Sequence, residues 1–355
     1  MRRSPLIRLL VVCAFCLGPK LAYACKECGN LLNLTLQELY NLEIVQMNAL
    51  GAHMHPDGER MFGYHYMFMN MEGIRDGRSG VTPAQIFARH PNYTVAHVKM
   101  EMHEHMFDAM YAPSDRVTLM AMLPYKRMSM LHTTPTGTMF TQHARGVGDL
   151  EIMGMFTVSG DIKKTGHRLM ADVGLSLPTG STNVQDHDRG DATKPLVKLE
   201  YPMQLGSGTY DLLPGLTYLG DSGKWAWGVQ AMATLRIGRN SRDYRLGNQF
   251  QASGWVAYGL SEWLAPYVRV ESRIAKNISG RDPAYGLVPK SGEARPDKQA
   301  GERVNLLFGV NLYAPKGSLK GNRITLEGGT AIYERLNGPQ LGLDYALKAG
   351  WTYGF

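Results

Sequence analysis

Segments of strand length in which apolar and polar residues alternate run through most of the chain, and this pattern limits what it can fold into. A strand that crosses a membrane needs about 9–11 residues with one apolar and one polar face. Segments 224–237 and 303–312 fit this description. The last segment, 343–355, has an apolar row made of Leu343, Tyr345, Leu347, Ala349, Trp351, Tyr353 and Phe355. The sequence therefore predicts an all-β protein.

Two other fold classes fit the sequence poorly. A helical membrane protein needs apolar runs of about 20 residues, and none follows residue 24. A soluble β-sandwich also alternates, but it does not usually expose whole rows of Trp, Leu and Val to water. The rows therefore predict a transmembrane antiparallel β-barrel.

The C-terminal residues favour the same fold. Lys348, Gly350, Tyr353 and Phe355 form the pattern polar–x–Gly–x–x–aromatic–x–aromatic, which ends on the terminal Phe. This pattern resembles the signal that the barrel assembly machinery recognises in outer-membrane proteins. The resemblance implies that this machinery is a partner of the chain, with Phe355 as part of the recognised signal.

The spacing of the alternating segments predicts about twelve strands. Short turns of such barrels face the periplasm and long loops face outward, so an even number of strands brings both termini to the periplasmic side. The expected long connections are 72–96, 127–146, 178–206, 238–247, 276–302 and 334–342. The strands are expected near 60–71, 97–111, 115–126, 147–159, 167–177, 207–219, 224–237, 248–259, 262–275, 303–314, 321–333 and 343–355.

The N-terminus predicts export from a Gram-negative cell. Residues 1–24 have a basic start, a short apolar core and the sequence Ala22-Tyr23-Ala24 before a cleavage point, which is typical of a signal peptide. Acylation of Cys25 as a lipoprotein is the rival interpretation. Residues 25–58 form a predicted periplasmic segment with a short amphipathic helix, acting as a helix or partial lumen plug, and 59–355 form the predicted barrel.

Cys25 and Cys28 are the cysteines that remain after cleavage. Because the exported compartment is oxidising, a short disulfide loop is the favoured interpretation. A metal or redox role is the alternative, and it has no second cysteine pair to support it.

Methionine and histidine are concentrated in the first half of the chain. Of the 21 Met residues, 18 lie between Met47 and Met170, and all 11 His residues lie between His53 and His187. Many Met residues recur two positions apart, which places them on one face of a strand. In four predicted strands the opposite face already carries the apolar or aromatic row, as Phe62, Tyr64, Tyr66 and Phe68 do in the first. These Met residues are therefore predicted to face the lumen.

Thioether and imidazole groups together suit Cu(I) and related soft ions. The predicted metal ligands, lining one side of the lumen and its mouth, are Met67, Met69, Met71, Met100, Met102, His103, His105, Met106, Met120, Met122, Met153 and Met155. His103 and His105 fall on the same strand face as Phe107, which is predicted to face lipid. For these histidines to be ligands, either a β-bulge intervenes or they lie beyond the hydrocarbon layer. The alternative is that Met pads a narrow lumen.

Enzymatic and nucleic-acid functions find no support in the sequence. No nucleophile–base pair or cysteine array stands out, and Gly206-Ser207-Gly208 lacks the lysine that a phosphate loop needs. The net charge of +7 is spread without a dense Lys/Arg run, so it does not indicate nucleic acid. No cofactor is required, and the residues suggest a copper ion, Cu(I), or another soft metal ion.

Three short glycine-containing motifs resemble a known family. They are Gly146-Val147-Gly148-Asp149-Leu150, Gly174-Leu175-Ser176-Leu177-Pro178-Thr179-Gly180 and Gly206-Ser207-Gly208-Thr209-Tyr210-Asp211. In this order they are similar to the outer-membrane transporters named for the meta-pathway of phenol degradation, over about residues 115–355. The resemblance implies an outer-membrane channel for aromatic or other hydrophobic molecules, and it brings no defined functional residues. The Met/His-rich half departs from the family and favours a copper-linked variant.

The expected function is passage or handling of a small solute across the outer membrane, with copper or another soft metal ion involved. A channel for hydrophobic or aromatic compounds is the first alternative, and a non-conducting metal-binding or structural barrel is the second. The expected partners are outer-membrane lipid, the assembly machinery and the solute itself.

Overall fold

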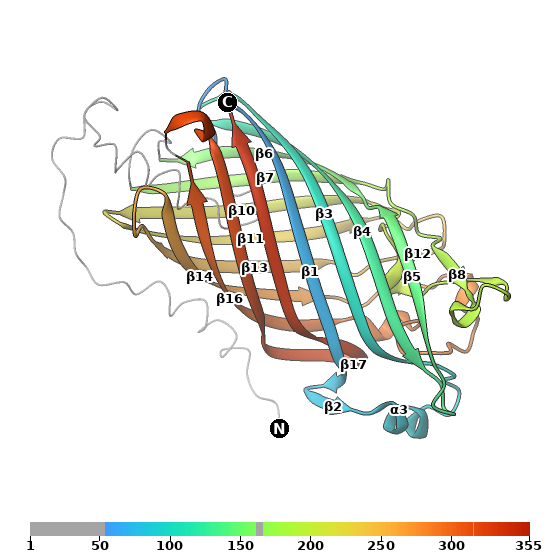
Figure 1. The fold of residues 1–355 in the computed structure, drawn as a ribbon. Coiled ribbons are helices and arrows are strands. Elements are labelled where there is room, and N and C mark those ends of the chain that lie inside the picture. The colour runs from blue at the N-terminus through green and yellow to red at the C-terminus, as the bar shows by residue number, and fades with distance from the viewer. Residues whose placement is uncertain (1–53, 161–165, 315) are drawn as a thin grey trace, which may run out of the picture. The chain divides into compact units, whose positions relative to one another are not determined.

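The computed structural model describes residues 54–160, 166–314 and 316–355, and Figure 1 shows that they form a β-barrel. The predicted signal peptide, the cysteine pair and the predicted N-terminal helix lie outside the described residues. The strands of the barrel wall are β1 (Arg60–Gly77), β3 (Ala96–Ser114), β4 (Val117–Thr133), β5 (Met139–Val147), β6 (Leu150–Ser159), β7 (His167–Leu177), β10 (Tyr210–Ser222), β11 (Trp225–Ile237), β13 (Gln249–Tyr258), β14 (Leu264–Ala275), β16 (Gly301–Tyr313) and β17 (Asn322–Gly354).

The sheet closes on itself, as a barrel requires. Its order is β17-β16-β14-β13-β11-β10-β7-β6-β4-β3-β1, and β17 also pairs with β1. Every one of these pairings is antiparallel. The additional strands β5 and β2 (Ser79–Val81) pair with β4 and β1. The predicted all-β barrel fold is thus confirmed.

Element β17 crosses the wall twice. Its residues 323–336 pair with β16, whereas residues 336–354 pair with β1. The element therefore folds back on itself near residues 337–340, and the two arms lie between β16 and β1 in Figure 1. Eleven strands close the ring. One of them, β17, crosses the wall twice, so the wall consists of twelve strand crossings. This number agrees with the strand count expected from the sequence.

The two ends of the barrel differ. The start of β1, Phe355 and the short connections lie at one end, which we call the turn end. The long connections lie at the other, which we call the loop end. The loop end carries helix α3 (Pro83–Arg89), the short strands β8 (Gln185–His187), β9 (Leu196–Lys198), β12 (Tyr244–Arg245) and β15 (Ser279–Gly280), and the single 3-10 turns at 188–190, 201–203, 283–285 and 296–298. Among the described residues, no helix has the length and apolar content to cross a membrane.

Two of the expected long connections lie where they were predicted but are much shorter. Residues 127–146 were expected to be a loop, but β4 continues to Thr133 and pairs with β5, so only residues 134–138 connect them. Residues 334–342 were also expected to be a loop, but strand pairing continues through most of them. In both places the backbone groups pair with each other beyond the expected strand ends, which satisfies their hydrogen bonds.

A two-residue turn shows how local sequence sets the register. Ser222 pairs with Trp225, so Gly223 and Lys224 alone connect β10 to β11. Gly223 has a φ of 57°. Tight hairpin turns of this kind need positive φ, which glycine adopts without steric cost.

Apolar side chains cover the outer surface of the barrel. Phe62, Phe107 and Leu119 are 55%, 53% and 47% exposed, although their neighbours along the strands, Met61 and Met120, are buried. Rows of exposed large apolar residues on every other position are the mark of a surface that faces lipid. The inner face is thereby left for the polar residues and methionines.

Candidate functional site: a methionine-lined lumen

Methionines stand directly opposite one another on the inner faces of neighbouring strands. At the turn end, Met110 pairs with both Met61 and Met120, and Met120 pairs in turn with Met153. Four thioethers from β1, β3, β4 and β6 therefore form one row across the wall, which we call ladder A. Residues opposite each other in antiparallel strands have Cβ atoms about 4.5–5.5 Å apart, so these flexible side chains reach one another.

Two further methionine ladders lie toward the loop end. Met69, Met102 and Met128 form ladder B across β1, β3 and β4. Met71, Met100 and Met130 form ladder C across the same three strands. Ladders B and C occupy successive inward positions, which lie about 6.8 Å apart along a strand. An ion held by one ladder would thus be close to the other.

A polar band separates ladder A from ladders B and C. His65 Nε2 lies 3.0 Å from Asp108 Oδ1, and Lys126 Nζ lies 3.6 Å from Glu104 Oε2. The predicted ligand Met67 is paired with Glu104 in the strand register, and Met122 is paired with Asp108. These methionines belong to the lumen, as expected, but not to a ladder. Met106 is paired with His65 in the same band.

Ladder A is part of a cluster of buried hydrophobic side chains toward the turn end. The cluster also contains Met54, Met155, Met170, Leu213, Leu219 and Trp255. Met54 comes from the segment that precedes β1 and is 6% exposed. The neighbouring backbone N–H of His55 donates a hydrogen bond to Thr118 Oγ1 at 3.1 Å. Side chains thus occupy the lumen at this end, as a barrel of this size permits.

The wall opposite the ladders is charged. Arg269 donates to both carboxylate oxygens of Glu327, at 2.8 and 2.6 Å, and also to Glu271 at 2.8 Å. Glu334 accepts from Arg75 and from Arg303, each at 2.8 Å. The lumen therefore has a methionine-rich side on β1, β3, β4 and β6, interrupted by the polar band, and an ion-paired side mainly on β14, β16 and β17.

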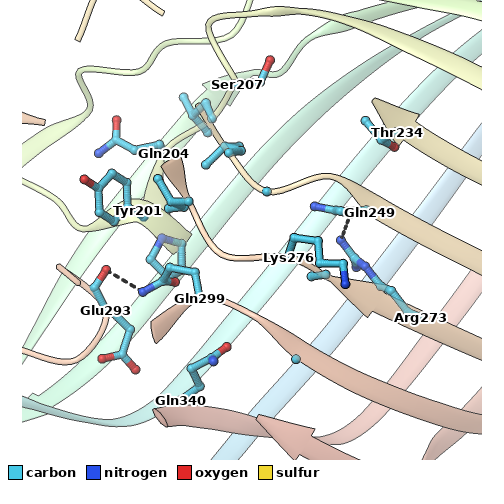
Figure 2. A pocket seen from close by; sticks show the side chains of 18 of the residues that line it. Tyr201, Gln204, Ser207, Thr234, Gln249, Arg273, Lys276, Glu293, Gln299 and Gln340 are labelled. Atoms are coloured by element: carbon cyan, nitrogen blue, oxygen red, sulfur yellow. Dashed lines mark hydrogen bonds between the residues drawn. The ribbon is translucent and has the colours of Figure 1, made fainter. Parts of the chain in front are cut away.

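A cavity of about 560 Å³ lies between these walls near the loop end. Ladders B and C contribute Met69, Met71, Met100 and Met130 to its lining. Figure 2 shows the polar part of the lining, with Gln249 and Arg273 on one side and Gln299 and Glu293 on another. Gln299 donates to the Glu293 carbonyl at 3.1 Å, and Arg273 donates to Gln249 Oε1 at 2.5 Å. The cavity is suited to a small polar or charged solute.

Loop segments cover the loop end of this cavity. The ring of Tyr201 packs edge-on against Tyr244 and Tyr285, with centroids 4.9 and 4.7 Å away. The Tyr201 hydroxyl accepts a hydrogen bond from the Asp282 backbone N–H at 3.0 Å. Three loops are thereby tied together over the lumen.

The structure does not bring His103 and His105 into the methionine set. His103 is paired with Phe68 and His105 with Tyr66, so both lie on the outer face of β3. The Tyr66 hydroxyl is 2.7 Å from His103 Nδ1, and the Tyr64 hydroxyl is 2.8 Å from His105 Nδ1. The strand register runs without a shift from residue 99 to 111, so the β-bulge considered from the sequence is absent there. Each histidine instead has a tyrosine partner that satisfies its ring nitrogen.

The structure also adds methionines that the predicted set omitted. Four residues belong to ladders although only their ladder partners were predicted as metal ligands: Met61, Met110, Met128 and Met130. Their inward parity was readable from the sequence for Met61 and Met110. Met128 and Met130 were missed because residues 127–146 were taken as a loop.

A second group of metal-ligating side chains lies at the loop end and was not predicted. His97 and His132 are opposite each other in β3 and β4, and Glu200 and Glu293 approach them from two loops. Burial raises the pKa of Glu293. Burial also acts to raise the pKa of Glu200, but attraction to His97 outweighs it and the pKa is lowered. No local motif links these four residues, so only the folded chain reveals the group.

Comparison with known proteins supports the fold. No family model and no curated protein matches the chain. The crystal structure of an outer-membrane channel from Pseudomonas putida F1 matches with a TM-score of 0.60 and 16% identity, covering 86% of this chain and 99% of that one. The P. putida toluene transporter TodX matches with a TM-score of 0.41 and 9% identity, covering 85% and 91%. The second likeness is too distant to carry an inference, and the first shows that this chain has the fold of an outer-membrane β-barrel.

Proposed function

We propose that the chain is an outer-membrane channel that handles a soft metal ion, Cu(I) or the chemically similar Ag(I), along the methionine side of its lumen. In this proposal the turn end faces the periplasm, and the assembly machinery recognises the C-terminal segment that ends on Phe355. The observation that carries the proposal is the set of three methionine ladders, which cross neighbouring strands on the inner face.

The chemistry of the ladders suits a soft cation. Thioethers are neutral, so they bind Cu(I) without losing a proton, and soft sulfur ligands select this ion over hard cations. Each ladder offers three or four sulfurs from adjacent strands, and flexible methionine side chains can converge on one ion. Exchange between ladders B and C requires only a short step along the strands. Several weak sites in a row favour movement over storage.

The polar band and the closed turn end fit a gated path. An ion that leaves ladder B meets the carboxylates of Glu104 and Asp108 before it reaches ladder A. Ladder A lies inside this buried hydrophobic cluster, so passage requires methionine side chains to change rotamer. Methionine has three rotatable bonds and tolerates such repacking better than branched residues.

The test is titration of the purified, detergent-solubilised barrel with Cu(I) under reducing conditions, and with Ag(I), with Cys25→Ser and Cys28→Ser in every protein so that thiolates do not contribute. Two variants replace ladder residues by Leu, which keeps volume and apolarity and removes the sulfur. One carries Met61, Met110, Met120 and Met153→Leu, and the other carries Met71, Met100 and Met130→Leu. The control is Met139→Leu, because Met139 is 60% exposed and lies outside the ladders.

We expect wild type and the control to bind Cu(I), and each ladder variant to lose part of that binding. Equal binding by all four proteins, or no binding by wild type, would refute the metal proposal. Single-channel conductance and uptake of a small aromatic solute by the same proteins then separate the alternatives. Aromatic uptake that the Leu variants retain favours a channel for hydrophobic compounds, and absence of any conductance favours a structural barrel.

A further inference from the structure

Two histidines and two glutamates meet beneath the loops at the loop end of the barrel. His97 comes from the beginning of β3 and His132 from the end of β4. Glu200 follows β9, and Glu293 lies in the connection between β15 and β16. Segments that are far apart in the sequence therefore place four ionisable side chains together.

The geometry of this group is that of a metal site. One atom each from His97, His132 and Glu200 can be chosen so that all three lie within 4.8 Å of one another. Both imidazoles are 2% exposed. Glu200 Oε2 contacts His97 Nε2, while the other oxygen of Glu200 accepts a hydrogen bond from the Ser291 hydroxyl. In the described part of the chain, His132 Nδ1 is buried without a hydrogen-bond partner.

We propose that His97, His132 and Glu200 bind a divalent transition-metal ion of the Zn(II) or Cu(II) kind, with Glu293 positioning His97. Two imidazole nitrogens and one carboxylate oxygen are the ligand set of many zinc sites that keep a fourth position open. Glu293 Oε2 is 2.5 Å from His97 Nδ1. A carboxylate on the second ring nitrogen fixes the orientation of a metal-bound histidine and raises its basicity.

A purely structural role explains the group less well. A buried polar atom such as His132 Nδ1 normally has a hydrogen-bond partner, because leaving it unpaired costs free energy. A metal ion would use this nitrogen and would offset the charge of the two carboxylates. The ring of His132 is stacked on Phe140 at 4.8 Å, which holds it in place.

The position of the site relates it to the lumen. Glu293 also lines the 560 Å³ cavity, and Met100 and Met130 of ladder C lie a few residues further along β3 and β4. A divalent ion bound here would sit at the loop-end boundary of the methionine side. The inference does not depend on the proposed function, because Zn(II) prefers nitrogen and oxygen or thiolate ligands over thioethers.

The test uses Zn(II) titration by calorimetry on the full chain in detergent, with Cys25→Ser and Cys28→Ser in every protein so that thiolates do not contribute. His132→Phe removes a ligand and keeps a flat ring against Phe140. Glu293→Gln keeps the shape of the positioning residue and removes its charge. The control is His143→Gln, an exposed histidine of β5. Heat-modifiable gel mobility reports whether each variant is folded.

We expect wild type and the control to bind one Zn(II) per chain at this site, and His132→Phe to lose that binding. Glu293→Gln should weaken it by about 10–100-fold, the usual effect of removing a partner that orients a ligand. With Cu(II), the electron paramagnetic resonance spectrum should show fewer nitrogen ligands in His132→Phe. Unchanged Zn(II) affinity in folded His132→Phe, or in folded Glu293→Gln if His132→Phe does not fold, would overturn the inference. An equal loss in His143→Gln would also overturn it. Failure of the Cu(I) titration would leave this result untouched.

Discussion

Arg60 and Phe355 exchange two backbone hydrogen bonds at the turn end of the barrel. The Arg60 N–H donates to the Phe355 carbonyl at 3.0 Å, and the Phe355 N–H donates to the Arg60 carbonyl at 2.9 Å. The Phe355 ring stacks on Phe62 and Tyr353, with centroids 5.9 and 5.6 Å away. Phe355 thus completes the pairing between β1 and the end of β17, which closes the barrel; we call this pairing the seam.

The first prediction concerns this seam. Deleting Phe355 should lower the fraction of chain that is folded and inserted, because it removes both hydrogen bonds and the terminal aromatic ring. Phe355→Ala keeps the backbone and should have a smaller effect, since an aromatic pair contributes about 0.5–1.5 kcal/mol beyond its buried area. Heat-modifiable gel mobility of membrane fractions measures the folded amount. Trp263→Ala, an exposed aromatic away from the seam, is the control, and a deletion variant that folds as well as this control would contradict the prediction.

The second prediction concerns the ion pairs on the charged wall. Arg269→Leu should lower the free energy of unfolding by about 3–5 kcal/mol, because it leaves Glu327 and Glu271 in the lumen without their main partner. The double variant Arg269→Leu/Glu327→Leu should lose less, since it removes the unpaired Glu327 charge. Urea unfolding in detergent measures both values. Arg295→Leu, which breaks an exposed pair with Asp297, should cost at most about 1 kcal/mol. A double variant less stable than Arg269→Leu would argue against this account.

The third prediction concerns the loops over the cavity. Tyr201→Ala should loosen the junction with Tyr244, Tyr285 and Asp282, since it removes two ring contacts and one hydrogen bond. The expected result is a larger or more frequently open single-channel conductance in a planar bilayer, together with a stability loss of about 3 kcal/mol. Tyr210→Ala is the control, because Tyr210 is 57% exposed on the outer face. Conductance traces that match for the two variants would show that these loops do not limit access.

The sequence by itself determined the fold and the side of the wall on which each strand residue lies. Alternation has a period of two and is a local property, so Met67, Met69 and Met120 were assigned to the inner face and Phe62 and Phe107 to the outer face without any structure. The same parity pointed to the outer face for His103 and His105, so the prediction of these two histidines as lumen ligands was wrong. Most strand positions were also predictable, because an apolar row ends where turn residues begin, but β5 and the loop-end extension of β4 were missed.

The tertiary structure alone decided which inward residues meet. Ladder A depends on the register that pairs Met61 with Met110 and Met120 with Met153, and register is set by turns and by long-range packing around the ring. The site of His97, His132, Glu200 and Glu293 depends further on two loops folding over the barrel end. Neither relationship leaves a local pattern, because residues far apart along the chain come together only when the ring is closed and its loops are docked.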